Sequence, residues 1–178
     1  QWVKKELKRT ELYGKKLGVV GCGRIGQMVA QRALAFGMTV YGCDQIAIHS
    51  EYIAKQKSLY EMITECDYLT LHLPSTDSTK AIIRKHVIDR MKDGVYIVNT
   101  GRGALIVEED IVEALKSGKI AGYAADVFHN EPPEGSPLLT APNVLLAPHI
   151  GASTKENLLR IGDTVVDLLE DYKNGLLV

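Results

Sequence analysis

Short apolar runs alternate along the chain with longer stretches in which apolar positions repeat at helical spacing. The short runs predict six buried strands, at residues 17–20, 39–43, 68–72, 95–99, 123–127 and 144–147. Helices are expected between them. This alternation is typical of a parallel sheet with right-handed crossovers and helices on both faces. The pattern therefore predicts an α/β, doubly wound domain with about six strands in the order 3-2-1-4-5-6.

Helix boundaries follow from capping signals. The first helix after the glycine turn is expected to end at Gly37 and to bury Ile25, Met28, Val29, Ala33 and Phe36. Ser58 and Glu61 have capping-box spacing and predict a helix to about residue 65. Further helices are expected at residues 2–10, with Trp2 and Leu7 as contacts, and at 85–91.

Two helices are predicted in the second half of the chain. One begins at Glu108 and ends before Gly118, with Ile111, Val112 and Leu115 as its apolar stripe. A second capping box, Ser153 with Glu156, predicts the last helix, whose apolar positions are Leu158, Ile161, Val165, Leu168 and Tyr172. Residues 128–142 hold four of the six prolines and show no periodicity. A loop of that length in a compact domain is often functional.

Composition places the chain among ordinary globular domains. Its 178 residues are 46% hydrophobic, enough for one domain, here residues 1–178. A balance of 21 basic and 22 acidic side chains gives no reason to expect nucleic acid or an anionic membrane as partner. Cys22, Cys43 and Cys66 lack metal-ligand spacing and indicate reduced, partly buried thiols. We therefore expect a cytoplasmic location and no metal site.

A glycine-rich turn joins the first strand to the first helix. Its pattern, Gly-x-Gly-x-x-Gly, falls at Gly21, Gly23 and Gly26. The backbone N–H groups of Arg24 and Ile25 then lie at the positive end of a helix, where phosphate oxygens bind. Asp44 ends the second strand, eighteen positions beyond Gly26, where a dinucleotide site has the acid that binds ribose hydroxyls. No arginine follows to pair with a 2′-phosphate, so the motif predicts NAD as the cofactor.

Four polar residues follow the later strands, where ligands bind in parallel sheets. They are Arg102, Asp126, Glu131 and His149. Arginine can hold a carboxylate with two hydrogen bonds, and histidine exchanges protons near neutral pH. A glutamate beside the imidazole would fix its tautomer. These residue types suit hydride transfer between nicotinamide and C2 of a 2-hydroxy or 2-oxo acid, with the proton passing through histidine.

Each of these residues also has a structural interpretation. Arg102 could anchor a loop, His149 could stabilise a turn, Glu131 could be a solvated charge and Asp126 could cap a turn. A purely structural interpretation requires all four to be true at once, whereas one shared site accounts for all of them together. The other histidines, His49, His72, His86 and His129, are interpreted as structural or surface residues. A methyltransferase that binds S-adenosylmethionine also uses a glycine-rich turn, but it leaves Arg102, Glu131 and His149 without a role.

Residues 17–26, 99–103, 125–132 and 148–153 resemble the D-isomer-specific 2-hydroxyacid dehydrogenases, and most of all their phosphoglycerate dehydrogenase group. The resemblance implies that Arg102 binds the substrate carboxylate and that His149 is the general acid and base, with Glu131 as its partner. It also implies cofactor contacts at Leu73, Pro74, Thr100, Gly101, Arg102, Asp126, His149 and Gly151. A phosphoglycerate-like substrate is favoured.

The resemblance also implies a split substrate-binding domain, of which we expect no part within residues 1–178. The resemblance therefore implies an isolated coenzyme-binding domain that forms a homodimer and has little activity alone. A second possibility is an NAD(H)-sensing interaction module, as in transcriptional corepressors that are similar to the same family. Such a sensor would bind another protein in an NAD-dependent manner, whereas an enzyme would oxidise NADH in a substrate-dependent manner once the full chain is restored.

Overall fold

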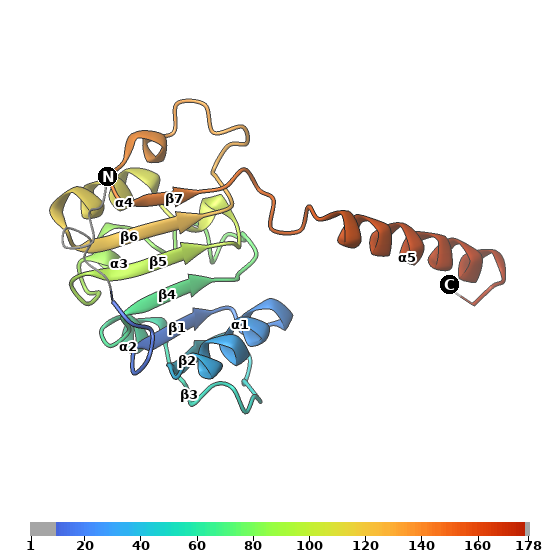
Figure 1. Ribbon diagram of the computed structural model, residues 1–178, viewed down its shortest axis with the longest axis horizontal. Coiled ribbons are helices and arrows are strands. Elements are labelled where there is room, and N and C mark those ends of the chain that lie inside the picture. The colour runs from blue at the N-terminus through green and yellow to red at the C-terminus, as the bar shows by residue number, and fades with distance from the viewer. Residues whose placement is uncertain (1–9, 177–178) are drawn as a thin grey trace, which may run out of the picture.

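The computed structural model describes residues 10–176, which form one seven-stranded parallel sheet with helices around it (Figure 1). The strands are β1 (Lys16–Val20), β2 (Thr39–Cys43), β3 (Lys55–Gln56), β4 (Tyr68–Leu71), β5 (Val95–Asn99), β6 (Ile120–Ala125) and β7 (Val144–Leu146). The helices are α1 (Arg24–Ala35), α2 (Leu59–Ile63), α3 (Lys85–Ile88), α4 (Glu108–Ser117) and α5 (Lys155–Lys173), with 3-10 turns η1 (Gly103–Leu105) and η2 (Pro137–Thr140).

The sheet has the order β3-β2-β1-β4-β5-β6-β7, which confirms the doubly wound class. Its outer strand β3 was not expected, because two exposed polar residues carry no apolar pattern. The segment expected as the third strand is β4, which pairs with β1 and not with β2, as Gly18 opposite Leu69 shows. The chain therefore crosses from one half of the sheet to the other between β3 and β4.

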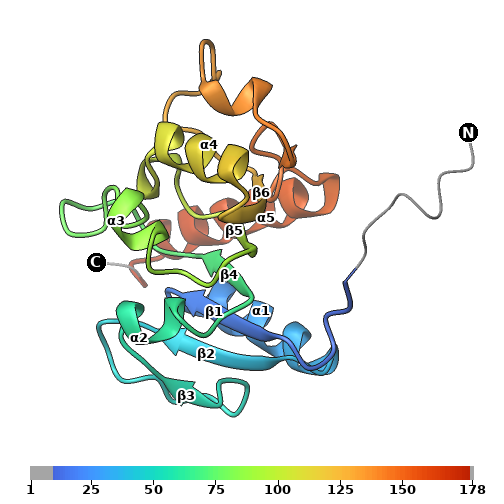
Figure 2. The same ribbon diagram turned by 90° about the vertical axis from the view of Figure 1, so that its left-hand side faces the viewer.

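Two apolar clusters mark the two faces of the sheet. The larger cluster packs α2, α3 and α4 on β4, β5 and β6, and includes Met62, Ile88, Ile97 and Ile111. The smaller cluster packs α1 on β1 and β2. Figure 2 shows α1 on one side of the sheet and α2, α3 and α4 on the other. The sequence pattern of α4 is confirmed, since Ile111, Val112 and Leu115 are buried and Gly118 ends the helix with φ 79°.

The face by which α1 packs agrees with the expectation only in part: Ala33 is buried and Val29 packs against the smaller cluster, but the other three expected residues are exposed. Its buried residues are Gly26, Ala30 and Ala33, whereas Ile25 is 63% exposed and Met28 54% exposed. Small residues let the helix axis approach β1 and β2 closely, and this turns the larger side chains outward. Phe36, at the end of the helix, is also exposed.

Several boundaries were also displaced. The capping box of Ser58 and Glu61 is confirmed, but α2 ends at Ile63. The helix at 85–91 is only α3, four residues long. β6 starts at Ile120, three residues before the predicted start, because the small Ala121 and Gly122 interrupt the apolar pattern. The loop at 128–142 contains the 3-10 turn η2. The expected helix at 2–10 lies almost wholly outside the described residues.

The last helix was capped differently from the prediction. Thr154 is the N-cap of α5, and its hydroxyl accepts from Asn157 N at 3.1 Å. Ser153 belongs instead to the preceding turn, where its N–H donates to the Ile150 carbonyl. The capping box of Ser153 and Glu156 is therefore wrong.

α5 runs away from the sheet, and none of its residues is buried (Figure 1). The apolar positions expected on it, Leu158 to Tyr172, are exposed. The α1 side of β5, β6 and β7 also has no helix over it among residues 10–176, and Leu145 there is 75% exposed. No helix in this described part is both long and apolar enough to cross a membrane.

Candidate active site

Because every strand is parallel, all seven carboxyl ends lie at one edge of the sheet, and α1 begins there. The first hydrogen bond of the helix runs from Gln27 N to Gly23 O. The N–H groups of Arg24, Ile25 and Gly26 make no hydrogen bond to any of residues 10–176. Three free donors at a helix N-terminus can bind an anion such as a phosphate.

The three glycines of the turn have different surroundings. Gly21 has φ 92°, and a Cβ there would lie 2.8 Å from the His72 carbonyl. At Gly26, a Cβ would collide with the Gly21 carbonyl, so this position needs glycine for helix and turn to pack. The space beside Gly23 is open. The turn therefore offers room and backbone donors on the side where a pyrophosphate would lie.

Asp44, at the end of β2, points toward the same turn. Its Oδ2 atom accepts from Cys22 N at 2.7 Å, and its Oδ1 atom accepts from Ile46 N at 3.3 Å. A carboxylate has about four lone-pair sites, so both oxygens can still accept from ribose hydroxyls. Gln56 holds the following loop through the Asp44 and Ile46 carbonyls.

Leu73 and Pro74 follow β4 and lie between the turn and β5. The Leu73 carbonyl packs on Gly101, where a Cβ would be 3.0 Å away. The Pro74 carbonyl accepts from the hydroxyl of the buried Thr79 at 2.7 Å, and this hydroxyl also accepts from Thr76 N. This polar loop is therefore ordered by its own hydrogen bonds.

The end of β5 presents Thr100, Gly101 and Arg102. Asn99, which is fully buried, accepts from Gly101 N at 3.1 Å and donates to the Arg102 carbonyl at 3.0 Å. Arg102 donates to the Gly101 carbonyl, and no carboxylate of residues 10–176 lies within ion-pair distance of it. Its guanidinium is therefore able to bind an added carboxylate.

Gly103 brings this loop against the next one. Its Cα faces the Phe128 carbonyl with no room for a side chain. Glu108 then fixes the segment beyond Phe128, because its buried carboxylate accepts from His129 N and from the Ser136 hydroxyl. Arg102 and Glu131 are thus carried by loops in direct contact.

Glu131 and His149 are hydrogen-bonded, with 2.7 Å between Oε2 and Nδ1. The other oxygen, Oε1, accepts from Phe128 N at 3.1 Å. The bond to His149 and then the bond to Phe128 N lower the pKa of Glu131 below its usual value. An ionised carboxylate at Nδ1 requires the proton on that nitrogen, which leaves Nε2 to exchange a proton with a substrate.

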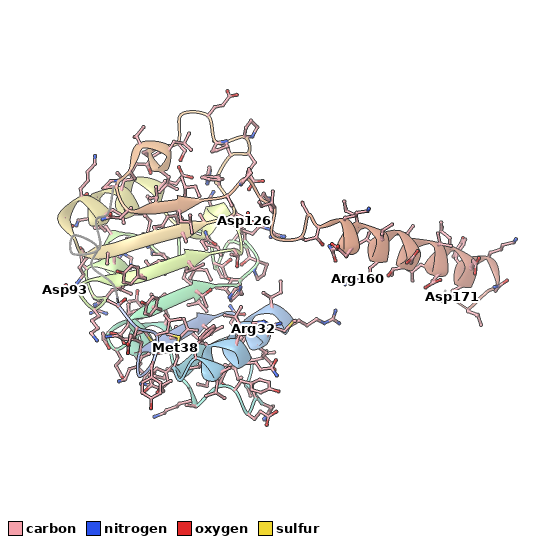
Figure 3. All side chains as sticks on the ribbon, viewed as in Figure 1. Arg32, Met38, Asp93, Asp126, Arg160 and Asp171 are labelled. Carbon is pink, nitrogen blue, oxygen red and sulfur yellow. The ribbon has the colours of Figure 1, made fainter. Side chains whose placement is uncertain are left out.

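Asp126 holds the loop that carries His149. Its two oxygens accept from Ile150 N at 2.8 Å and from Gly151 N at 2.7 Å. His149 itself has φ 55°, an uncommon conformation for a residue other than glycine. Figure 3 shows Asp126 at the carboxyl edge of the sheet, where the connection to α5 begins. The position of the imidazole is thus set by backbone hydrogen bonds.

A cavity of about 370 Å³ lies elsewhere, between the loop of residues 129–137 and the segment that leads into α4. Lys80, Glu109 and Pro133 are among its lining residues, and none of the predicted site residues is. Sequence reasoning missed Asn99, Thr79 and Glu108, which order the site loops. Of these three residues, only Asn99 could have been found from the sequence, because it is a polar residue at the end of an apolar strand.

Comparisons with known proteins agree with this geometry. Residues 1–151 match the family model described as D-isomer specific 2-hydroxyacid dehydrogenase, NAD binding domain. The D-3-phosphoglycerate dehydrogenase of Methanocaldococcus jannaschii is 44% identical over 99% of this chain and 34% of its own length. The hydroxypyruvate reductase of Thermotoga maritima is 45% identical over 94% of this chain and 56% of its own length.

A solved structure shows the same likeness. The D-lactate dehydrogenase of Aquifex aeolicus, complexed with NAD and lactic acid, superposes with a TM-score of 0.86 at 34% identity, covering 96% of this chain and 56% of that one. The chain thus spans from about a third to just over half of the length of these relatives. On the family match, the identities and the shared fold, the chain belongs to the D-isomer-specific 2-hydroxyacid dehydrogenases and corresponds to their NAD-binding domain.

Proposed function

We propose that this chain is the coenzyme-binding domain of an NAD-dependent oxidoreductase that interconverts a 2-hydroxy acid and its 2-oxo acid. The observation that carries the proposal is the 2.7 Å hydrogen bond between Glu131 and His149, at the edge of the sheet where Arg102 has no acidic partner among residues 10–176. Asp126 holds the loop of His149 there. The relatives it matches are longer than this chain, and we propose that the chain works with a second, substrate-binding domain.

The chain fits NAD at that edge. The free N–H groups at the start of α1 and the open space at Gly23 would receive the pyrophosphate, and Asp44 would accept from the adenosine ribose. Contacts along Leu73, Pro74, Thr100, Gly101, Asp126 and Gly151 would follow the same edge. NAD, when bound, supplies the carbon that accepts the hydride from C2 of the hydroxy acid.

The protein residues then have distinct tasks. Arg102 binds the substrate carboxylate and so orients C2 toward the cofactor. His149 Nε2 removes the hydroxyl proton during oxidation and returns it during reduction. Glu131 keeps Nδ1 protonated and balances the charge of the imidazolium formed in oxidation.

The preferred substrate class is phosphoglycerate-like. Support comes from several relatives, at 44% and 41% identity, that are named D-3-phosphoglycerate dehydrogenase. A relative at 45% identity is named hydroxypyruvate reductase, so a substrate panel must include both oxo acids.

NADH oxidation by the protein that carries this chain tests the proposal. We expect turnover with hydroxypyruvate 3-phosphate to exceed that with hydroxypyruvate, glyoxylate and pyruvate. His149→Gln should lower kcat by at least about 100-fold, as expected for loss of a general acid, while the Kd for NADH stays within about twofold. His86→Gln, at an exposed histidine on α3, is the matched control. Full activity of His149→Gln would overturn the assignment.

We further propose a homodimer in the cytoplasm. The exposed apolar side chains of α1, α5 and Leu145 support an interface between copies. Trp2, in the expected leading helix, is a further candidate for this interface, but it lies outside the described residues. The free thiols of Cys22, Cys43 and Cys66 are compatible with a reducing compartment. Sedimentation that shows only monomer at micromolar concentration would contradict the dimer.

A further inference from the structure

The His72 side chain spans the ends of two neighbouring strands at the carboxyl edge. Its Nε2 atom lies 2.9 Å from the Thr70 hydroxyl on β4, and its Nδ1 atom lies 3.3 Å from the Thr100 hydroxyl after β5. Its backbone N–H donates to the Val20 carbonyl of β1 at 2.8 Å. His72 therefore connects three strands at the place where the sheet order reverses and dinucleotides bind.

Burial of the two hydroxyls determines which way the hydrogen bonds run. Thr70 is buried, and His72 Nε2 is the only hydrogen-bond partner of its hydroxyl among residues 10–176. If Nε2 carried a hydrogen, the Thr70 hydrogen would be a buried donor without an acceptor, which is rare and costly. Thr70 must then donate to Nε2.

The proton on the imidazole consequently lies on the other nitrogen. Burial lowers the pKa of His72 below its usual value, so the ring is neutral at neutral pH and has one N–H. With Nε2 as acceptor, Nδ1 donates to the oxygen of Thr100. The hydrogen of the exposed Thr100 hydroxyl is then not used by His72 and is free to turn toward a ligand at the carboxyl edge of the sheet.

We propose that His72 is a positioning residue for the cofactor. It holds the Thr100 hydroxyl as an acceptor from Nδ1, so that Thr100 donates its own hydrogen to an oxygen atom of bound NAD. This inference rests on the proposed function, because it takes NAD to be the ligand that binds at this edge of the sheet. The direction of donation runs from Thr70 through His72 and Thr100 to the cofactor.

The tautomer can be measured without any ligand. Long-range ¹H–¹⁵N correlation spectra of the chain at pH 7.5 should show His72 protonated at Nδ1 alone. Thr70→Val removes the donor to Nε2 and should produce a second population protonated at Nε2. A wild-type ring protonated at Nε2 would overturn the proposed order of hydrogen bonds, whether or not NADH binds.

Cofactor affinity tests the second half of the proposal. Calorimetric titration should give a Kd for NADH that rises about 3- to 10-fold in His72→Phe and in Thr100→Val, the effect of one hydrogen bond, and no further in the double variant. His72→Asn keeps a donor near the place of Nδ1 and should recover most of the affinity. His86→Phe, at an exposed histidine that contacts the Tyr60 hydroxyl, should bind like the wild type.

The outcomes separate this inference from the proposed function. Additive losses in the double variant, or equal losses in the Asn and Phe variants, would show that His72 acts through packing alone and would overturn the positioning role. Failure of the wild-type chain to bind NADH would instead contradict the proposed cofactor function and the destination of the Thr100 hydrogen, while the Nδ1 tautomer would still be expected.

Discussion

The Asp44 carboxylate is bonded to the backbone of the glycine turn, with 2.7 Å between its Oδ2 atom and the nitrogen of Cys22. The ends of β1 and β2 are thereby joined before any ligand arrives. A ribose that binds Asp44 would meet a carboxylate already fixed in direction, so little ordering free energy is lost on binding.

Asp44→Ala should raise the Kd for NADH at least about tenfold, because hydrogen bonds from ribose hydroxyls to a charged acceptor are lost. NADPH should bind the wild type weakly, since its 2′-phosphate would face this carboxylate. Calorimetry with both nucleotides checks the result. Asp93→Ala is the matched control, because Asp93 pairs with Lys119 at the opposite edge of the sheet (Figure 3). Equal affinity of wild type and Asp44→Ala would remove Asp44 from the site.

Asp126→Asn should loosen the loop that carries His149. An amide side chain offers one acceptor oxygen where the carboxylate accepts from both Ile150 N and Gly151 N. We expect hydrogen exchange at these two amides to accelerate at least about tenfold. Asp93→Asn provides the control, and unchanged exchange in Asp126→Asn would mean that other contacts hold the loop.

The pair of Glu131 and His149 should make stability depend on pH. The pKa of Glu131 is lowered in the folded chain, so the unfolded chain binds the proton more tightly at this site. The contribution of Glu131 is therefore present above the ordinary carboxyl pKa of about 4.3 and is lost as the pH falls through the folded value. Denaturant unfolding of wild type and Glu131→Gln should converge between about pH 5 and pH 3. The control is Glu109→Gln, at an exposed position next to Glu108, and its stability should follow that of the wild type at every pH in this range.

Glu108→Ala should destabilise the fold by about 2–3 kcal/mol, because it leaves His129 N and the Ser136 hydroxyl without their acceptor. Glu109→Ala at the next, exposed position should change stability by less than about 0.5 kcal/mol. Chemical denaturation measures both. Similar small effects in the two variants would show that solvent replaces the carboxylate.

Removal of residues 154–178 should change the free energy of unfolding of the sheet domain by less than about 0.5 kcal/mol, because no residue of α5 is buried against that domain. The shortened chain should also associate less, since it loses the exposed apolar side chains of the helix. Unfolding curves and sedimentation velocity check the two effects. A large loss of stability would show that α5 is covered in solution by a surface that residues 10–176 of one copy do not supply.

Local signals predicted most of the fold. Apolar runs located six strands, and the Ser58 capping box and Gly118 located helix ends, because these depend on neighbouring residues. The two-residue β3 and the pairing of β4 with β1 depend on contacts distant in sequence. The packing face of α1 was only partly predicted: Ala33 is buried as expected, but helical spacing alone does not reveal that the small Gly26 and Ala30 pack on the sheet in place of Ile25 and Met28.

Arg102, Asp126, Glu131 and His149 were proposed from their places after the strands, whereas the contacts at residues 73–74, 100–101 and 151 came from the family resemblance. What sequence could not supply was the supporting contacts. Asn99, Glu108 and His72 act through partners brought close only by folding, and His72 was interpreted as structural or surface. Such partners also determine which of the two ring nitrogens of a neutral imidazole carries the proton.

The anchoring of the His149 loop by main-chain groups also bears on how the sequence can change over time. At position 150 Asp126 recognises an N–H that nineteen of the twenty amino acids possess, so this site can accumulate substitutions other than proline while the imidazole stays in place. Position 151 lacks that freedom, because a Cβ would lie 2.9 Å from the Asp126 carboxylate. Descendants of this chain could therefore alter the surface beside the histidine at position 150 without rebuilding the loop.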